Sequence, residues 1–178
     1  MKLNKILMSV GAALIFTSTA SFAVTDPTSG TINFEGKLVN SACGLAASSS
    51  PVIVKFDETT TSSLKDGGEH SSQTKNIELV DCDTTLAKHA TVTYQPNTIN
   101  VNDDTLAAIL SGTASGAGIG LRDNAGQPVK WGVPSAPVEL QDGDFVIPFT
   151  AFVKADNASH AVTPGKFTSQ INFKIEYQ

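Results

Sequence analysis

The sequence ends in an alternation of polar and apolar residues that runs without a break from Gly165 to Gln178. Every even position of this stretch is polar, and five of its seven odd positions are apolar. Such a period of two predicts a half-buried β-strand. Its apolar positions are Phe167, Ile171, Phe173, Ile175 and Tyr177. Because the sequence stops on this strand, we expect its far edge to be covered by an earlier segment or by another molecule.

The other end of the chain has the pattern of a secretory signal. Lys2 and Lys5 precede an apolar run over residues 6–16, and Ser21-Phe22-Ala23 places small residues at positions minus three and minus one of a cleavage site. A run of about eleven apolar residues is too short to span a bilayer. We therefore predict cleavage after Ala23 and export of residues 24–178; the alternative reading of the run is a buried core helix.

Composition excludes several classes of function. The exported part is rich in Thr, Ser, Gly, Ala and Val, and the chain has a formal net charge of -5. Without a basic stripe to contact phosphates, we expect no nucleic-acid partner. The histidines are scattered, and neither a Ser-His-Asp set nor a nucleophile-elbow motif is present, so we predict no catalytic residue, no cofactor, no small-molecule substrate and no enzyme activity.

The two cysteines, Cys43 and Cys82, both lie in the exported part of the chain. An even number of cysteines in an oxidising compartment favours a disulfide, which the chain-entropy model values at about 4 kcal/mol for a loop of this length. A metal site lacks ligands, because neither cysteine has a Cys or His partner at close spacing.

Short β-prone runs separated by turn residues recur along the exported chain. Many short strands with little room for helices predict an all-β sandwich of one domain. Residues 105–110 are ambiguous, since their spacing also fits a helix capped by Asp104, and Pro148 predicts a sheet edge or a bulge. The predicted strands are Gly36–Ala42, Pro51–Phe56, Thr74–Val80, Ala90–Tyr94, Gly118–Arg122, Val129–Val133, Phe145–Lys154 and the terminal Gly165–Gln178.

A second alternating segment precedes the first of these strands. In residues 24–35 the even positions Gly30, Ile32 and Phe34 form one face, and Gly36 marks a break after it. Burying Ile32 and Phe34 is worth about 3–6 kcal/mol. The segment therefore needs a groove, and the simplest candidate is the groove of its own sandwich.

Four motifs in order carry a resemblance to a known family. They are Gly30-Thr31-Ile32-Asn33-Phe34-Glu35-Gly36, Leu38-Val39-Asn40-Ser41-Ala42-Cys43, Leu79-Val80-Asp81-Cys82-Asp83-Thr84, and the ending with Gly165 and a penultimate Tyr177. Together they resemble a major structural subunit of chaperone-usher pili of the type 1 fimbrial group. The resemblance runs through the whole chain, although residues 51–73 and 97–116 match in composition alone.

The resemblance implies an immunoglobulin-like β-sandwich that lacks its last strand and leaves a groove beside the terminal strand. Residues 1–23 would be the signal peptide, 24–35 an N-terminal donor-strand extension, and 36–178 the pilin domain. A periplasmic chaperone would first pair along Phe167–Tyr177 and hold the carboxylate of Gln178. After delivery to the outer-membrane usher, the extension of a neighbouring subunit would replace it, with Ile32 and Phe34 in groove pockets and Gly30 where a side chain does not fit. The product would be an adhesive surface fimbrium.

Several features keep alternative interpretations. Gly165 either leaves a pocket open at the end of the groove or is a turn glycine after Pro164. Trp131 is read as packing, with sugar stacking as the alternative, and the paired aspartates beside Cys82 and Gly143 are read as turn residues. Asn157 begins a glycosylation sequon that we interpret as a polar loop. A minor pilus adaptor and an exported carbohydrate-binding module remain the alternative functions.

Overall fold

The computed structural model describes residues 28–157 and 161–178. The predicted signal peptide and residues 24–27 of the predicted extension lie outside the described residues, as does most of the Asn157 sequon. The chain divides into two units, Met1–Lys37 and Leu38–Gln178. Residues 28–37 of the first unit have no regular secondary structure. In the described part of the chain, no helix has the length and hydrophobicity needed to cross a membrane.

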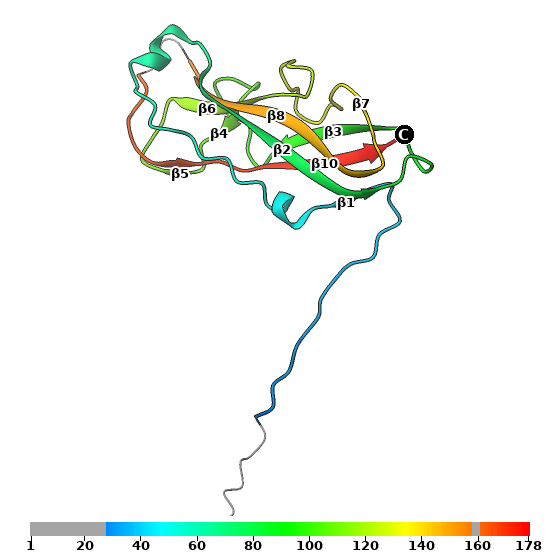
Figure 1. Ribbon diagram of the computed structural model, residues 1–178. Helices are drawn as coiled ribbons and strands as arrows, with labels where there is room; N and C mark the ends of the chain where they lie inside the picture. The colour runs from blue at the N-terminus through cyan, green and yellow to red at the C-terminus, as the bar shows by residue number, and fades with distance from the viewer. Residues whose placement is uncertain (1–27, 158–160) are drawn as a thin grey trace, which may run out of the picture. The chain divides into compact units, whose positions relative to one another are not determined.

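The second unit is built from antiparallel strands in two main layers (Figure 1). The five-stranded sheet has the order β1-β2-β8-β6-β4, and the three-stranded sheet has the order β10-β3-β7. A two-stranded sheet pairs β5 with β9, and two 3₁₀ turns, η1 (Ala47–Ser49) and η2 (Ser63–Asp66), complete the elements. The strands are β1 (Gly44–Leu45), β2 (His70–Cys82), β3 (His89–Pro96), β4 (Ala107–Ala108), β5 (Ser111–Gly112), β6 (Ala117–Arg122), β7 (Val138–Glu139), β8 (Gly143–Ala155), β9 (Phe167–Thr168) and β10 (Ile171–Tyr177).

The main core lies between the two sheets. Ile77 of β2 and Ile147 of β8 are fully buried, and they belong to the same cluster as Val92 and Tyr94 of β3. A smaller cluster forms around Ile119 and Val153 at the other end of β6 and β8. Alternating side chains from both inner faces fill the space between the sheets, as in a β-sandwich.

Four of the predicted strands are observed within longer strands. Thr74–Val80, Ala90–Tyr94, Gly118–Arg122 and Phe145–Lys154 lie within β2, β3, β6 and β8. The predicted terminal strand is present in two pieces, β9 and β10, with Ser169 and Gln170 between them. The hydroxyl of Ser169 donates to the carbonyl oxygen of Ala108 at 2.7 Å at this interruption.

Three predicted strands are wrong. Gly36–Ala42 is not a strand, because the first ladder begins at Gly44, opposite Val80 of β2. Val129–Val133 bends through a turn in which Gly132 has φ 74°, a conformation that a regular strand does not contain. Pro51–Phe56 keeps the alternation of a strand in its burial but has no ladder partner in the described chain.

Two local predictions are resolved by hydrogen bonding. Residues 105–110 form no helix: the carboxylate of Asp103 accepts the N–H of Thr105 at 3.0 Å, and the turn leads into β4. Pro148 pairs with Asn76 of β2, whereas the ladder between β8 and β6 begins only at Thr150. The proline therefore lies where β8 has a neighbouring strand on one side, as a residue without an N–H requires.

A disulfide joins Cys43 to Cys82, with a Cα–Cα distance of 4.1 Å. It lies where the chain enters β1 and β2 ends, and the N–H of Asp83 donates to the carbonyl oxygen of Ala42 at 2.8 Å beside it. Both sulfur-bearing residues are buried. The bond therefore fixes the start of the sandwich to the end of β2, which is one of its two longest strands.

Candidate functional site

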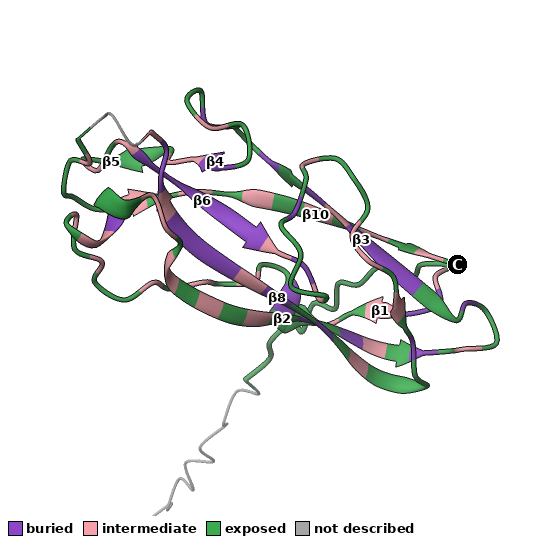
Figure 2. Ribbon diagram, turned by 90° about the horizontal axis from the view of Figure 1, so that it is seen from above, coloured by how far each residue is buried: buried purple, intermediate pink, exposed green. Residues whose placement is uncertain are grey.

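One part of the apolar core is left half covered. Ten apolar residues pack against the main core cluster and remain only partly buried, and seven of them come from β10 and one other segment. β10 itself contains no fully buried position (Figure 2). We call these seven residues the apolar strip. It consists of Val52, Val54 and Phe56 from one segment and Ile171, Phe173, Ile175 and Tyr177 from β10.

The backbone of the C-terminal strand is paired along one edge only. Gln178 exchanges both backbone hydrogen bonds with His89, at 2.8 and 2.9 Å, and the carbonyl oxygens of Gln170 and Thr168 accept from Asn97 and Leu110. Residues two apart on a strand direct their peptide groups to the same edge. All even positions therefore face β3 and β5, and all odd positions direct their N–H and C=O groups to the opposite edge.

That opposite edge has no backbone partner within the described residues. The odd positions also supply the apolar side chains of the strip, so one set of residues has both unpaired peptide groups and half-covered side chains. This combination is the requirement for adding another strand: an edge that supplies hydrogen bonds and alternate side chains that supply contacts.

The second wall of the strip is the segment 51–56. Val52, Val54 and Phe56 turn toward the core, whereas Ile53 is 60% exposed. The ring of Phe56 lies 6.1 Å from the ring of Phe167, which brings the segment to β9 at one end of the strip. The sequence predicted a strand here but no role in the site. The signal was obscured because Ile53 makes the run continuously apolar instead of alternating.

Gly165 lies at the same end, where the chain enters β9. A Cβ atom there would lie 2.6 Å from the amide nitrogen of Ala114, so a side chain does not fit without movement of the backbone. The N–H groups of Thr113 and Ala114 both donate to the carbonyl oxygen of Lys166. The close approach of two backbones is therefore enough to explain a glycine at this position. It is a third explanation, in addition to the open pocket and the turn glycine that the sequence suggested.

The predicted extension exposes its apolar side chains. Ile32 is 77% and Phe34 is 89% exposed, and Gly30 has no neighbouring atom where a Cβ would be placed. The same even positions continue through Gly36 to Leu38, which is fully exposed at 102%. Sequence reasoning stopped at Glu35 and missed Leu38, although its position in the alternation was readable.

A hollow adjoins the other end of the strip, beside Tyr177. Its volume is about 400 Å³, and it is lined by Asn40, Ser41, Ala42, Leu86, Ala87 and Tyr177. Burial raises the pKa of the Tyr177 hydroxyl, and a hydrogen bond with Ser41 opposes this shift. Next to it, the carbonyl oxygen of Gln178 accepts from the N–H groups of Lys88 and His89 at 2.8 and 2.9 Å.

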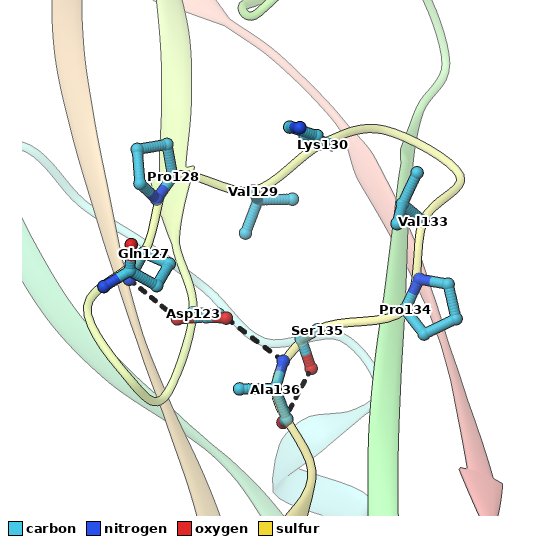
Figure 3. A pocket seen from close by; sticks show the side chains of 9 residues that line it. All are labelled: Asp123, Gln127, Pro128, Val129, Lys130, Val133, Pro134, Ser135 and Ala136. Atoms are coloured by element: carbon cyan, nitrogen blue, oxygen red, sulfur yellow. Dashed lines mark hydrogen bonds between the residues drawn. The ribbon is translucent and has the colours of Figure 1, made fainter.

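A second pocket, between β6 and β7, has a structural explanation (Figure 3). The Asp123 carboxylate lies in its wall and accepts the backbone N–H groups of Ala125, Gln127 and Ala136 at 3.0, 2.8 and 3.2 Å. These bonds hold the loop closed around the carboxylate, which is only 9% exposed. The pocket of about 190 Å³ therefore surrounds a satisfied loop anchor.

Of the paired aspartates, Asp83 and Asp142 lie in turns as predicted, whereas Asp81 and Asp144 lie within β2 and β8. Asp83 accepts the N–H of Thr85 two residues later, and the Asp142 carboxylate accepts the N–H and hydroxyl of Thr84, both at 2.7 Å, which lowers the pKa of Asp142. The described residues contain no group of three or more acidic, histidine or cysteine side chains suited to a metal. Trp131 packs against both core clusters.

Comparison with known proteins gives this arrangement a context. The family model described as "Fimbrial protein" matches residues 32–178. The chain belongs to this fimbrial family. Over the full length of both chains it is 49% identical to the major fimbrial subunit of Proteus mirabilis (strain HI4320), 36% identical to the fimbria A protein of Serratia marcescens and 35% identical to a type-1 fimbrial protein A chain of Escherichia coli.

Solved structures agree. A chain in the structure of a chaperone-usher pilus is 29% identical, with a TM-score of 0.73 over 88% of this chain and 100% of that one. The crystal structure of the P pilus rod subunit PapA is 28% identical, with a TM-score of 0.67 over 78% of this chain and 100% of that one. The protein is a structural subunit of a cell-surface fimbria that polymerises with neighbouring subunits, and its fold is the incomplete immunoglobulin-like sandwich of pilins.

Proposed function

We propose that the apolar strip is the acceptor site for donor-strand exchange and that the extension of a neighbouring copy is the donor. The proposal rests on one observation about β10. Within the described residues, the same positions of this strand have both unpaired peptide groups and half-buried apolar side chains, and these positions are Ile171, Phe173, Ile175 and Tyr177. An incoming ribbon would satisfy both at once.

The ribbon would lie between two walls. On one side it would pair with the free edge of β10. On the other side it would reach the segment 51–56, whose backbone also has no ladder partner among residues 28–157 and 161–178. Each peptide hydrogen bond contributes about 1 kcal/mol, and each buried anchor contributes about 1.5–3 kcal/mol. Resistance of the fibre to dissociation would come from the need to release the whole ribbon cooperatively.

The donor segment would extend through Leu38. One face of the segment has three exposed bulky residues, Ile32, Phe34 and Leu38. On that face Gly30 precedes Ile32, and Gly36 lies between Phe34 and Leu38. A completely exposed leucine in a fimbrial subunit is costly in water unless a partner covers it. Inclusion of Leu38 gives the ribbon a third anchor at its C-terminal end.

Before assembly, a periplasmic chaperone would occupy the strip, and the outer-membrane usher would be the place where the ribbon of the next subunit displaces it. The secretory signal pattern supports this route, because it directs the chain out of the cytoplasm. Basic residues of the chaperone would contact the terminal carboxylate of Gln178. The assembled fimbria would present an adhesin away from the cell, with no catalysis by this subunit.

The test is a variant in which residues 24–38 are deleted and placed, through a short turn, behind Gln178. We expect a monomer that no longer polymerises and whose unfolding midpoint in urea is well above that of the same domain without the ribbon. An unmodified domain that is monomeric and equally stable without a chaperone would contradict the proposal.

A matched pair of substitutions tests the donor face. Ile32→Asp or Phe34→Asp is expected to block fibre growth, because a carboxylate in the strip would be buried without a partner. Thr31→Asp places the same charge on the other face and is expected to leave growth intact. Fibres of normal length from Phe34→Asp, seen by electron microscopy, would exclude this residue as an anchor.

A further inference from the structure

We propose that the hollow beside Tyr177 binds the first residues of a neighbouring copy's exported chain, Val24 to Pro27. This inference rests on the proposed donor-strand function and adds a separate contact at the end of the ribbon. It assigns a role to the residues of the extension that do not suit the apolar strip.

The hollow is continuous with the strip through one side chain. Tyr177 is the last apolar residue of the strip and also a lining residue of the hollow. The hollow has a partly apolar lining: Ala42 and Ala87 are 6% and 9% exposed, whereas Leu86 is 65% exposed. An exposed leucine over two buried alanines gives a surface that a small apolar group can cover.

The direction of the ribbon decides which of its ends reaches this hollow. Every ladder in the described structure is antiparallel. A ribbon that also pairs antiparallel, here with β9 and β10, has its C-terminal end at Phe167 and its N-terminal end at Tyr177. This direction also suits the donor: Cys43, which is fixed in the donor's own sandwich, follows Leu38 closely and must lie beyond the end of the acceptor's strand.

The lengths of the ribbon and of the acceptor strand indicate where residues 24–27 of the ribbon would lie. Gly30 to Leu38 spans about 27 Å in extended conformation, and Phe167 to Tyr177 spans about 34 Å. With Leu38 beside Phe167, Gly30 lies within about two residues of Tyr177. Residues 24–27 therefore pass beyond the strand and reach the hollow, where no ladder edge continues.

The chemistry of these residues fits a hollow better than a strand edge. Pro27 has no N–H to donate, so it cannot continue the ladder with β10, but its ring and the Val24 side chain are small apolar groups. Asn40 and Ser41 in the lining offer side-chain donors and acceptors to the peptide groups of an irregular segment. Asp26 remains directed to water.

Hydrogen exchange in fibres of the full exported chain tests the inference. We expect the amides of residues 25, 26 and 28 to exchange at least about tenfold more slowly in the fibre than in the free subunit, in addition to protection of residues 30–38. Leu86→Ser is expected to restore fast exchange at 25–28 and to leave 30–38 protected. Leu110→Ser, which alters an exposed leucine elsewhere, is the control.

The outcomes separate the two proposals. Free-peptide exchange rates at 25–28 together with protection at 30–38 would overturn the assignment of the hollow while the donor function stands. The assignment of the hollow would also be overturned if the Leu86→Ser fibre exchanged at the same rates as the unmodified fibre. Fast exchange throughout 24–38 in intact fibres would overturn the donor function and this inference with it.

Discussion

β8 and β10 are both alternating apolar strands, and their surroundings differ. β8 pairs with β2 along most of its length and with β6 over its second half, and its inward residues Ile147, Ala151 and Val153 are 0–2% exposed. Among the strands that the structure describes, β10 pairs only with β3, and all its inward residues stay half-buried. One strand is complete within its own chain, and the other needs a second edge.

The difference teaches that alternation and pairing are separate properties. A period of two specifies which face of a strand is apolar, and both strands have it. The number of neighbouring strands depends on the topology of the whole sheet. In the function proposed above, the half-buried apolar face beside the unpaired edge of β10 would be the place where a strand of another subunit is added.

The largest effect in the free domain is expected from Ile147→Ala on the closed side. Loss of a fully buried side chain costs about 2–5 kcal/mol through lost transfer energy and a cavity. The cost should be the same in the free domain and in the variant with the ribbon moved behind Gln178, because β8 has no part in the strip. Urea unfolding of both forms measures it, with the 46% exposed Val146→Ala as control; a cost that depended on the ribbon would break the comparison.

Phe173→Ala on the open side should behave differently in the two forms. In the free domain the half-buried ring has less to lose, and we expect a cost of about 1–2 kcal/mol. With the ribbon in place the ring becomes part of a closed core, and the expected cost rises to about 3–5 kcal/mol. Equal costs in both forms would show that the ribbon does not cover this residue; Lys174→Ala on the outer face is the control.

Gly165→Ala tests the end of the strip where β5 meets β9. The added methyl group would push against the backbone at Ala114, and we expect a loss of about 1–3 kcal/mol in the unfolding free energy in both forms. Lys166→Ala, at the exposed neighbouring position, should leave stability nearly unchanged. A Gly165→Ala domain of unaltered stability whose fibres fail to grow would instead favour an open pocket at this glycine.

The smallest effect is expected at Asp103, which accepts a hydrogen bond from the Lys154 ammonium at 3.0 Å. Burial raises the pKa of Asp103, but the hydrogen bonds from Thr105 and Lys154 outweigh it, so the pKa lies below the ordinary value of 3.8. The contribution of the Asp103 carboxylate to the free energy of unfolding is therefore present above pH 3.8 and is lost as the pH falls below it. Asp103→Asn should reduce the loss of stability between pH 7 and pH 3 by less than about 1 kcal/mol, measured by urea unfolding. An unchanged loss would show that the pair does not respond to acid.

The sequence predicted those parts of the fold in which local pattern and sheet position agree. β2 and the first part of β8 alternate in burial, whereas β3 and β6 are mostly buried short apolar runs between turn residues. The two cysteines suggested their own pairing because they are the only two in the sequence. The error at Val129–Val133 comes from the turn at Gly132, whereas the errors at Gly36–Ala42 and Pro51–Phe56 have a common cause. Both runs are apolar and β-prone, but a ladder needs a neighbour, and neighbours are set by distant parts of the chain.

The candidate site was predictable on one side only. The terminal strand can be recognised from the sequence because no apolar residue of Gly165–Gln178 breaks the alternation. The opposite wall, Val52, Val54 and Phe56, was hidden by Ile53, and the hollow beside Tyr177 is formed by three segments far apart in the sequence. Leu38 was missed because Gly36 was read as a break, whereas a glycine can also continue an extended face where a side chain has no room.

The division of β10 into bonded even positions and free odd positions limits how assembly can go wrong. A ribbon displaced by one residue would turn Ile32 and Phe34 away from the core, and the loss of both contacts would reject it at once. Tolerable errors are thus restricted to shifts of two residues, about 7 Å each. In the proposed donor function, such a shift would put a glycine where a bulky side chain belongs, so the spacing of Gly30 and Gly36 would fix the distance between successive subunits.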